Sequence, residues 1–168
     1  CLNVGCIPSK AYLEHAHWVN SLKKAQGHGM DVAFKGVDYA KLKNRKDKVV
    51  SSLQGGIHAT FKSLDIRFIN GEATSISPNT FKVNDQTITA TDVILATGSR
   101  PFVPEIPGLA EVEYLTTDTI FELNDLPKQL VIIGGGVIAV ELAFALEAIG
   151  SQVTILEVAP DILLTEDE

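Results

Sequence analysis

Cys1 and Cys6 are the only two cysteines in this 168-residue sequence, and five positions separate them. In a regular helix, Cα atoms at that spacing lie roughly 8 to 9 Å apart, whereas a disulfide needs about 4.4 to 6.8 Å. A bond between them would therefore require distorted backbone, and Gly5 supplies the freedom for it. Closing so short a loop removes little entropy from the unfolded chain, so reversible redox chemistry is a better reason for pairing than stability.

Cys6 lies just ahead of Pro8, which suits the first position of a helix because its missing N–H would have no partner there. The free N–H groups and the dipole at a helix start favour a thiolate. Two alternatives stay open for the pair: half of a zinc site, or two unpaired thiols. The four histidines show no convincing ligand spacing for such a metal site.

A second chemical signal is the run Gly134-Gly135-Gly136-Val137-Ile138-Ala139, which follows an apolar run and opens a helical pattern. Gly134 permits a tight turn, Gly136 lets the backbone approach a pyrophosphate, and the small Ala139 allows close helix packing. The helix N–H groups and dipole would hold the phosphates. Glu157 follows 23 positions after Gly134, where a carboxylate can accept hydrogen bonds from an adenosine ribose and repel a 2′-phosphate, which favours NADH over NADPH.

The alternative for this run is a glycine-rich turn of another α/β fold with an incidental glutamate. Alanine at position 139 also occurs in some proteins that use NADPH, so the glycine pattern and Glu157 point in different directions, and the charge argument is the stronger. Glu141 stands on an otherwise apolar helix, where a buried acid is costly without a cation beside it.

The elements that must position these residues follow from periodicity. Helices are predicted over about residues 7–27 and 39–63, the second with a weak point at Gly55-Gly56. From Ile66 the period becomes two, and the runs IRFING, ATSIS, TFKVN and TITAT predict an antiparallel meander that turns at Asn84-Asp85. DVILATGSRP predicts an apolar strand and PFVPEIPG a linker, before LVII, the glycine-led helix and SQVTILE predict one βαβ unit.

Composition excludes some classes of function. A net charge of −7 gives no electrostatic footprint for nucleic acid, and the basic run Lys41–Lys48 is expected to be a solvated helix face. The longest apolar stretch, from Val131 to Leu146, contains glycines and Glu141 and falls short of a membrane span. We therefore expect neither a nucleic acid nor a membrane partner.

Three segments resemble one known family. CLNVGCIPSK is similar to the redox-active motif of the FAD-dependent pyridine nucleotide–disulfide oxidoreductases, DVILATGSRP to that family's second FAD-contacting segment, and VIIGGGVIAVE to its NAD-binding turn. The order and gaps also match, so the resemblance covers essentially the whole chain. Within the family, Leu2, Ile7 and Ser9-Lys10 look most like the dihydrolipoyl dehydrogenase branch; glutathione and mercuric reductases have similar segments.

This resemblance implies FAD and NAD as cofactors and gives the residues their roles. Cys1 would be the thiol that exchanges with substrate and Cys6 the thiol beside the flavin. Lys10 would lie near the flavin and pair with Glu141. The remaining residues implied to bind a cofactor are Ala73, Thr97, Gly98 and Ser99 for FAD, and Gly134, Gly135, Gly136, Val137, Ile138, Ala139, Val140, Glu141 and Glu157 for NAD.

The implied fold is α/β, with two Rossmann-like dinucleotide-binding domains, both incomplete, and a small antiparallel β-meander in the FAD domain. Residues 1–101 would belong to the FAD-binding domain and residues 102–168 to the NAD-binding domain. The implied activity is oxidation of dihydrolipoamide with reduction of NAD⁺, in a cytoplasmic homodimer that serves the dihydrolipoyl domain of a 2-oxo acid dehydrogenase-type complex.

Two other readings of the sequence are a mercuric or glutathione-type disulfide reductase and a dinucleotide-binding module without redox chemistry. The family's first FAD fingerprint and its His-Glu base match nothing in this sequence. We therefore expect an internal piece of a longer enzyme that is inactive by itself.

Overall fold

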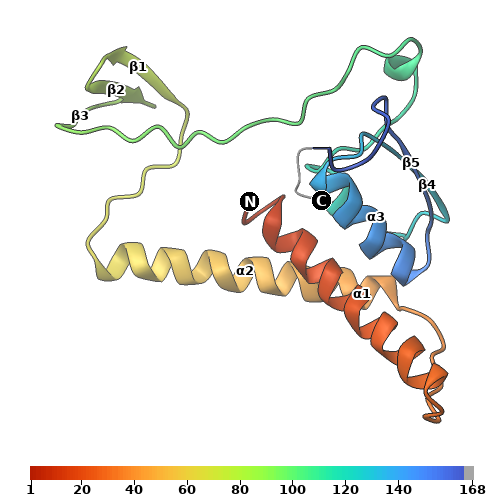
Figure 1. Cartoon of the computed structure of the whole chain (residues 1–168). Coiled ribbons are helices and arrows are strands. Elements are labelled where there is room, and N and C mark those ends of the chain that lie inside the picture. The colour runs from red at the N-terminus through yellow and green to blue at the C-terminus, as the bar shows by residue number, and fades with distance from the viewer. Residues whose placement is uncertain (165–168) are drawn as a thin grey trace. The chain divides into compact units, whose positions relative to one another are not determined.

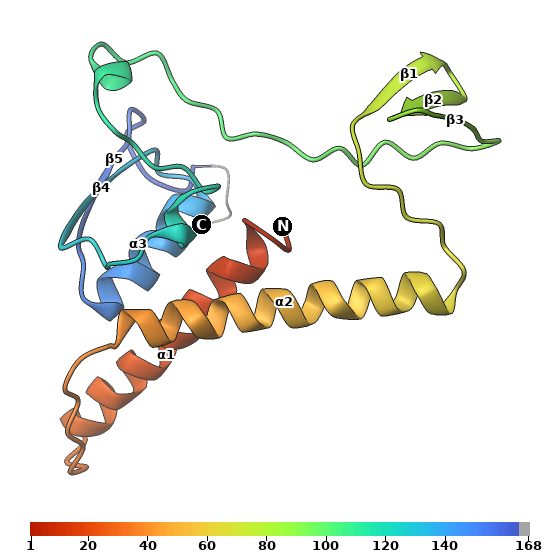
Figure 2. The ribbon, with the colours of Figure 1, turned by 180° about the vertical axis from the view of Figure 1, so that it is seen from behind.

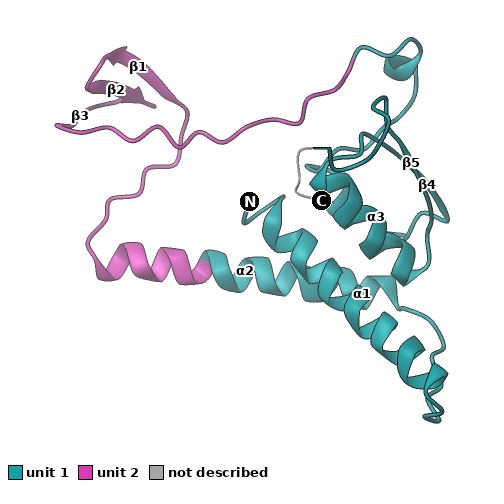
Figure 3. Cartoon of the chain, in the orientation of Figure 1, with its two compact units in different colours: residues 1–54, 105–168 teal, residues 55–104 magenta. Residues whose placement is uncertain are grey.

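The computed structural model describes residues 1–164, which form two compact units. One unit contains residues 1–54 together with the chain from residue 105 onward, and the other contains residues 55–104 (Figure 3). The helix α2 contributes to both units. Each unit is described by itself below.

The first unit carries the cysteines and the glycine run. Its elements, in chain order, are α1 (Cys6–Gly27), the first part of α2 (Tyr39–Ser63), the short 3-10 helices η1 (Leu109–Glu111) and η2 (Ile120–Glu122), β4 (Gln129–Ile133), α3 (Val137–Ile149) and β5 (Gln152–Leu156). The helix α1 begins at Cys6, two residues earlier than the position of Pro8 suggested. Pro8 is tolerated as the third helical residue because that N–H also has no acceptor within the helix.

The predicted βαβ unit is confirmed. The strands β4 and β5 are parallel, with Leu130 opposite Val153, and α3 connects them. The run LVII is continuously apolar, but the structure exposes alternate residues: Leu130 and Ile132 pack against the core, whereas Val131 is 58% exposed. The cause is that α3 covers only one face of this two-stranded sheet.

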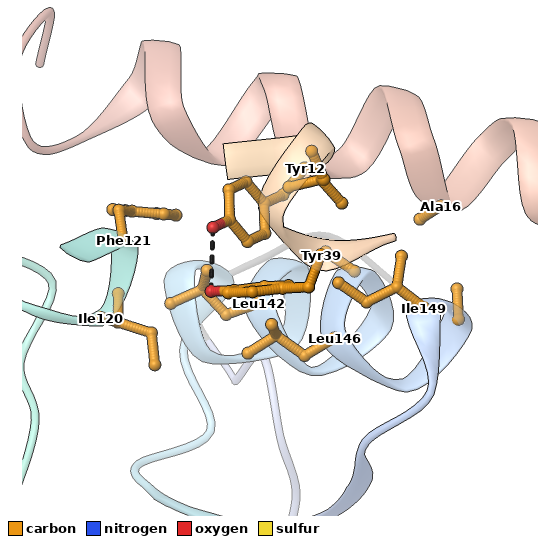
Figure 4. Packing of buried hydrophobic residues seen from close by; sticks show 11 residues of the cluster. Tyr12, Ala16, Tyr39, Ile120, Phe121, Leu142, Leu146 and Ile149 are labelled. Atoms are coloured by element: carbon orange, nitrogen blue, oxygen red, sulfur yellow. Dashed lines mark hydrogen bonds between the residues drawn. The ribbon is translucent and has the colours of Figure 1, made fainter. Parts of the chain in front are cut away.

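The core of this unit packs α1 against α3, which lie side by side in Figures 1 and 2. Its buried residues are Tyr12, Ala16, Tyr39, Leu42, Ile120, Phe121, Leu142, Ala145, Leu146, Ala148 and Ile149. The hydroxyl groups of Tyr12 and Tyr39 are hydrogen-bonded at 3.0 Å (Figure 4), and the ring of Phe121 packs edge-on against Tyr12. The helix that carries the cysteines is thereby fixed to α2, η2 and α3.

The second unit contains the remainder of α2 and the meander of β1 (Ala73–Ser77), β2 (Thr80–Val83) and β3 (Gln86–Thr89). The strands pair antiparallel in sequence order, and Asn84 adopts a left-handed conformation (φ 52°) at the predicted turn. The helix α2 has the predicted bounds and continues through Gly55-Gly56.

Two expected strands are absent from this unit. IRFING and DVILATGSRP form neither helix nor strand and pair with no strand among the described residues, and Ile94 is 91% exposed. An apolar sequence alone does not make a strand, because the backbone N–H and C=O groups need a neighbouring strand to pair with.

Candidate functional site

The two cysteines meet at the start of α1. Residues 2–4 form a turn rather than a helix, so Cys1 folds back over the first helical residue, Cys6. The Cys6 thiol donates a hydrogen bond to the Cys1 Sγ, with the sulfurs 2.8 Å apart, and both residues are unbonded and exposed. Distorted backbone was expected if the cysteines are bonded; the structure shows the backbone outside a regular helix while both thiols remain unbonded and exposed.

Gly5 makes this fold-back possible. The carbonyl of Cys1 accepts hydrogen bonds from the N–H of Gly5 at 3.1 Å and of Ile7 at 3.2 Å. A Cβ on Gly5 would lie 3.0 Å from the Cys1 Cα and 3.4 Å from its carbonyl oxygen. From the sequence, Gly5 was expected to act as a flexible joint. The structure shows that its absent side chain leaves room for the Cys1 backbone.

Lys10 and Glu141 form the predicted ion pair between α1 and α3. Lys10 lies one helical turn after Cys6, so both project from the same face of α1. The Lys10 side chain is 57% exposed and that of Glu141 is 32% exposed, so the acid is partly hydrated as well as paired. The contact joins the helix of the thiols to the helix of the glycine turn.

The glycine run forms a strand–turn–helix. Gly134 adopts a φ of 106°, which requires glycine, and its N–H donates to the Leu156 carbonyl at 2.8 Å. Gly136 is the N-cap of α3 and provides no side-chain cap, so the first N–H groups of the helix have no intrahelical acceptor. The space beside Gly136 is open, because a Cβ there would meet nothing within 4 Å. An uncapped helix start with open space fits the pyrophosphate of a dinucleotide.

Glu157 lies against this turn. Its Oε2 accepts the N–H of Gly135, and its Oε1 accepts the N–H groups of Val158 at 2.7 Å and Ala159 at 2.9 Å. The hydrogen bonds from Ala159, Gly135 and Val158 lower the pKa of the Glu157 carboxyl, so the group is ionised at neutral pH. A carboxylate has about four acceptor positions, and the three backbone donors leave capacity for a ribose hydroxyl.

The predicted FAD residues belong to the second unit. Ala73 starts β1, and Thr97, Gly98 and Ser99 lie in the irregular segment that follows the meander; all four are exposed. Gly98 has a φ of 72° and so needs glycine. Small, exposed residues fit a close backbone approach by a cofactor.

The described residues offer neither a metal centre nor a membrane-spanning helix. No group of three or more His, Cys, Asp or Glu side chains within residues 1–164 could hold a metal ion. Within the same range, no helix has both the length and the apolar character that a bilayer crossing requires.

The structure also shows contacts around the thiols that the sequence did not predict. The Gln54 side chain donates a hydrogen bond to the Asn3 Oδ1 at 2.8 Å, and the Ser9 hydroxyl donates to the Cys6 carbonyl at 3.1 Å. The Ser9 contact could have been anticipated, since serine in the first turn of a helix often bonds the backbone nearby. No sequence pattern could have indicated a contact between residues 51 positions apart.

The chain is similar to several known proteins. Residues 1–168 match the model of the family described as pyridine nucleotide-disulphide oxidoreductase. The chain is 40% identical over 162 residues to a dihydrolipoyl dehydrogenase of Mycoplasma pneumoniae, covering 94% of this chain and 35% of that protein. It is 36% identical to a mercuric reductase of Staphylococcus aureus, covering 99% and 31%.

Among solved structures, the HOCl-induced flavoprotein disulfide reductase RclA from Escherichia coli matches with a TM-score of 0.82 and 30% identity, over 100% of this chain and 35% of that one. The chain therefore spans about a third of the length of each of these three proteins.

Proposed function

Because this chain belongs to the pyridine nucleotide-disulphide oxidoreductase family, we propose that it is the thiol-bearing and NAD-binding part of a dihydrolipoyl dehydrogenase. The observation that carries the proposal is the joining of two sites in one compact unit. The adjacent thiols of Cys1 and Cys6 start α1, and the ion pair from Lys10 to Glu141 connects that helix to the dinucleotide turn. The identity to a dihydrolipoyl dehydrogenase supports the choice of substrate.

The chemistry assigned to the cysteines is thiol–disulfide exchange. When Cys1 and Cys6 are bonded, a thiolate of the dihydrolipoyl substrate attacks the Cys1 sulfur, forms a mixed disulfide and releases Cys6 as a thiolate. The second substrate thiol, once deprotonated, attacks the substrate's own sulfur in that bond and releases Cys1. The substrate leaves as a cyclic disulfide after losing two electrons and two protons, and the protein is left with two thiols.

The residues of this chain suit the two cofactors that members of the family use, FAD and NAD(H). Gly134–Glu141 would bind NAD, with the N–H groups at the start of α3 against its pyrophosphate, and the ionised Glu157 would accept hydrogen bonds from its ribose. Ala73 and Thr97–Ser99 would contact FAD. When bound, FAD would supply an acceptor for the electron pair of the dithiol, and NAD⁺ would supply the final hydride acceptor.

Further parts of this proposal concern the parent protein. Residues 1–101 would belong to its FAD-binding domain and residues 102–168 to its NAD-binding domain. The protein would act as a cytoplasmic homodimer on the dihydrolipoyl domain of a 2-oxo acid dehydrogenase-type complex. The support for these points is the set of dihydrolipoyl dehydrogenase relatives.

The test is an assay of the full-length protein that contains this chain. We expect NADH formation from dihydrolipoamide and NAD⁺, and loss of that activity in Cys1→Ser and in Cys6→Ser. A control substitution, Ser52→Ala on α2, should retain it. Turnover of Hg(II) or of glutathione disulfide with reduced nicotinamide, without dihydrolipoamide activity, would assign the protein to another branch of the family. Thiols that never pair in any redox buffer would refute redox chemistry altogether.

A further inference from the structure

The loop from Cys1 to Gly5 is held at two places. At its ends, the Cys1 carbonyl accepts the N–H groups of Gly5 and Ile7, which close the loop onto α1. At its middle, the Asn3 Oδ1 accepts the Gln54 Nε2 at 2.8 Å. The second contact comes from α2, a different element, and it restrains the part of the loop that the backbone hydrogen bonds leave free.

Gln54 lies far from the region where α2 is anchored to the core. The buried residues of α2 are Tyr39, Leu42 and Lys46, and Gln54 lies about 12 Å beyond Lys46 along the helix axis at ~1.5 Å per residue. The hydrogen bond to Asn3 therefore connects the thiol loop to a stretch of α2 that has left the core.

This contact contributes little to the stability of the fold. Both side chains are exposed, and an exposed neutral hydrogen bond exchanges one partner for water at small net gain. Its effect must instead be local. Asn3 is two residues from Cys1 and three from Cys6, so fixing Asn3 limits how far the Cys1 thiol can move from the Cys6 thiol.

We propose that Asn3 and Gln54 are positioning residues for Cys1, and that their hydrogen bond holds the Cys1 sulfur against Cys6 in the geometry from which the disulfide forms and exchanges. The proposal rests on the proposed function in that it takes Cys1 as the exchanging thiol. The hydrogen bond joins Gln54 to Asn3 and not to either sulfur, so both residues act through the loop backbone. A loop released from Gln54 leaves Cys1 more accessible to solvent reagents and less ready to close on Cys6.

The test uses three variants of the full-length holoprotein. Gln54→Met keeps the length of the side chain and removes its donor. Gln54→Glu removes the amide donor but offers an acceptor, so that Asn3 can restore the hydrogen bond by turning its amide and donating Nδ2. Gln26→Met on α1 is the matched control, since Gln26 is also exposed on a helix and lies near the end of α1 that is remote from the cysteines.

The first measurement is the rate of alkylation of Cys1 relative to Cys6 in the reduced protein, read by mass spectrometry after brief treatment with iodoacetamide. We expect Gln54→Met to raise this ratio about threefold, an effect in the range that one hydrogen bond can produce. The alkylation ratio of Gln54→Glu should stay within about twofold of the ratio in the unchanged protein, and the ratio of Gln26→Met should equal that of the unchanged protein. An unchanged ratio in Gln54→Met, or an equal change in Gln26→Met, would overturn the proposal.

The second measurement separates positioning from general damage. Gln54→Met should slow the reduction of the disulfide by dihydrolipoamide while leaving the reduction of ferricyanide by NADH unchanged, since that reaction bypasses the thiols. Equal loss in both reactions would show a structural defect and contradict the positioning role. If the unchanged protein does not oxidise dihydrolipoamide, the proposed function fails, and the alkylation ratio still decides the role of Asn3 and Gln54.

Discussion

Substitution of Gly5 by alanine tests the geometry of the thiol pair most directly. The new Cβ would lie 3.0 Å from the Cys1 Cα, whereas ordinary contacts begin at 3.4 Å. The Cys1 backbone must therefore move by about 0.4 Å, the difference between these two distances. Misplacement of reacting atoms by ~1 Å costs roughly 100-fold in rate, so we expect a loss of about sixfold in the closure of the disulfide.

The closure rate can be measured on the reduced full-length protein with a coloured aromatic disulfide. One thiol attacks the reagent and releases the first coloured thiolate, and the second thiol then displaces the remaining half from the mixed disulfide. The second phase is intramolecular and reports how readily Cys1 and Cys6 meet. Gly5→Ala should slow this phase about sixfold and leave the first phase nearly unchanged, because both thiols remain exposed.

Gly27→Ala is the control, because a Cβ at this last residue of α1 would meet nothing within 4 Å. Its closure phase should equal that of the unchanged protein. The overpacking at Gly5 should also lower the unfolding free energy by about 1 kcal/mol, the low end for such changes, since the loop is exposed. Equal closure rates in Gly5→Ala and the unchanged protein would refute the argument that Gly5 is needed for space.

Three further predictions concern the dinucleotide turn, the ion pair and the core. Glu157→Arg should lower kcat/KM for NADH at least about tenfold, through loss of a charge-assisted hydrogen bond, and raise kcat/KM for NADPH. An unchanged preference for NADH over NADPH in steady-state assays would contradict the assignment of Glu157 to the ribose. Glu141→Gln should change the unfolding free energy by less than about 1 kcal/mol in urea titrations, because a half-exposed ion pair is screened by water, and a larger loss would show that the pair supports the fold. Burial, and secondly the hydrogen bond with Tyr39, raise the pKa of Tyr12 above its ordinary value of 10.0. Above that pH the unfolded chain therefore loses a proton that the folded chain keeps, and the free energy of unfolding falls. The difference in unfolding free energy between the unchanged protein and Tyr12→Phe should therefore become smaller as the pH rises above about 10. A difference that stays constant or grows in denaturant titrations would be inconsistent with a raised pKa of Tyr12.

Much of the fold could be predicted because its signals are local. The helix 39–63, the turn at Asn84 and the βαβ unit all follow from periodicity and from the conformational preferences of single residues. The failures share one cause: IRFING and DVILATGSRP have strand composition, but a strand exists only where another strand pairs with it.

The candidate site also has features that the sequence predicted and features that depend on tertiary packing. The types and spacing of Cys1, Cys6, the glycine run and Glu157 favoured redox and dinucleotide chemistry but left other readings of the cysteine pair open. Packing of α1 against α3 decided that Lys10 reaches Glu141, a pairing the family resemblance had implied. Nothing in the sequence indicated the Tyr12–Tyr39 hydrogen bond or the contact of Gln54 with Asn3.

The sequence by itself determined which chemical groups this chain carries: two thiols, a cation, an acid and a glycine-led helix start. The tertiary structure decided their distances. Gly5 leaves room for the Cys1 backbone, the core places α1 on α3, and Gln54 reaches the thiol loop from α2. The physical reason is that conformational preference acts between neighbours in the chain, whereas close approach and hydrogen bonding between distant residues depend on how all the elements pack together.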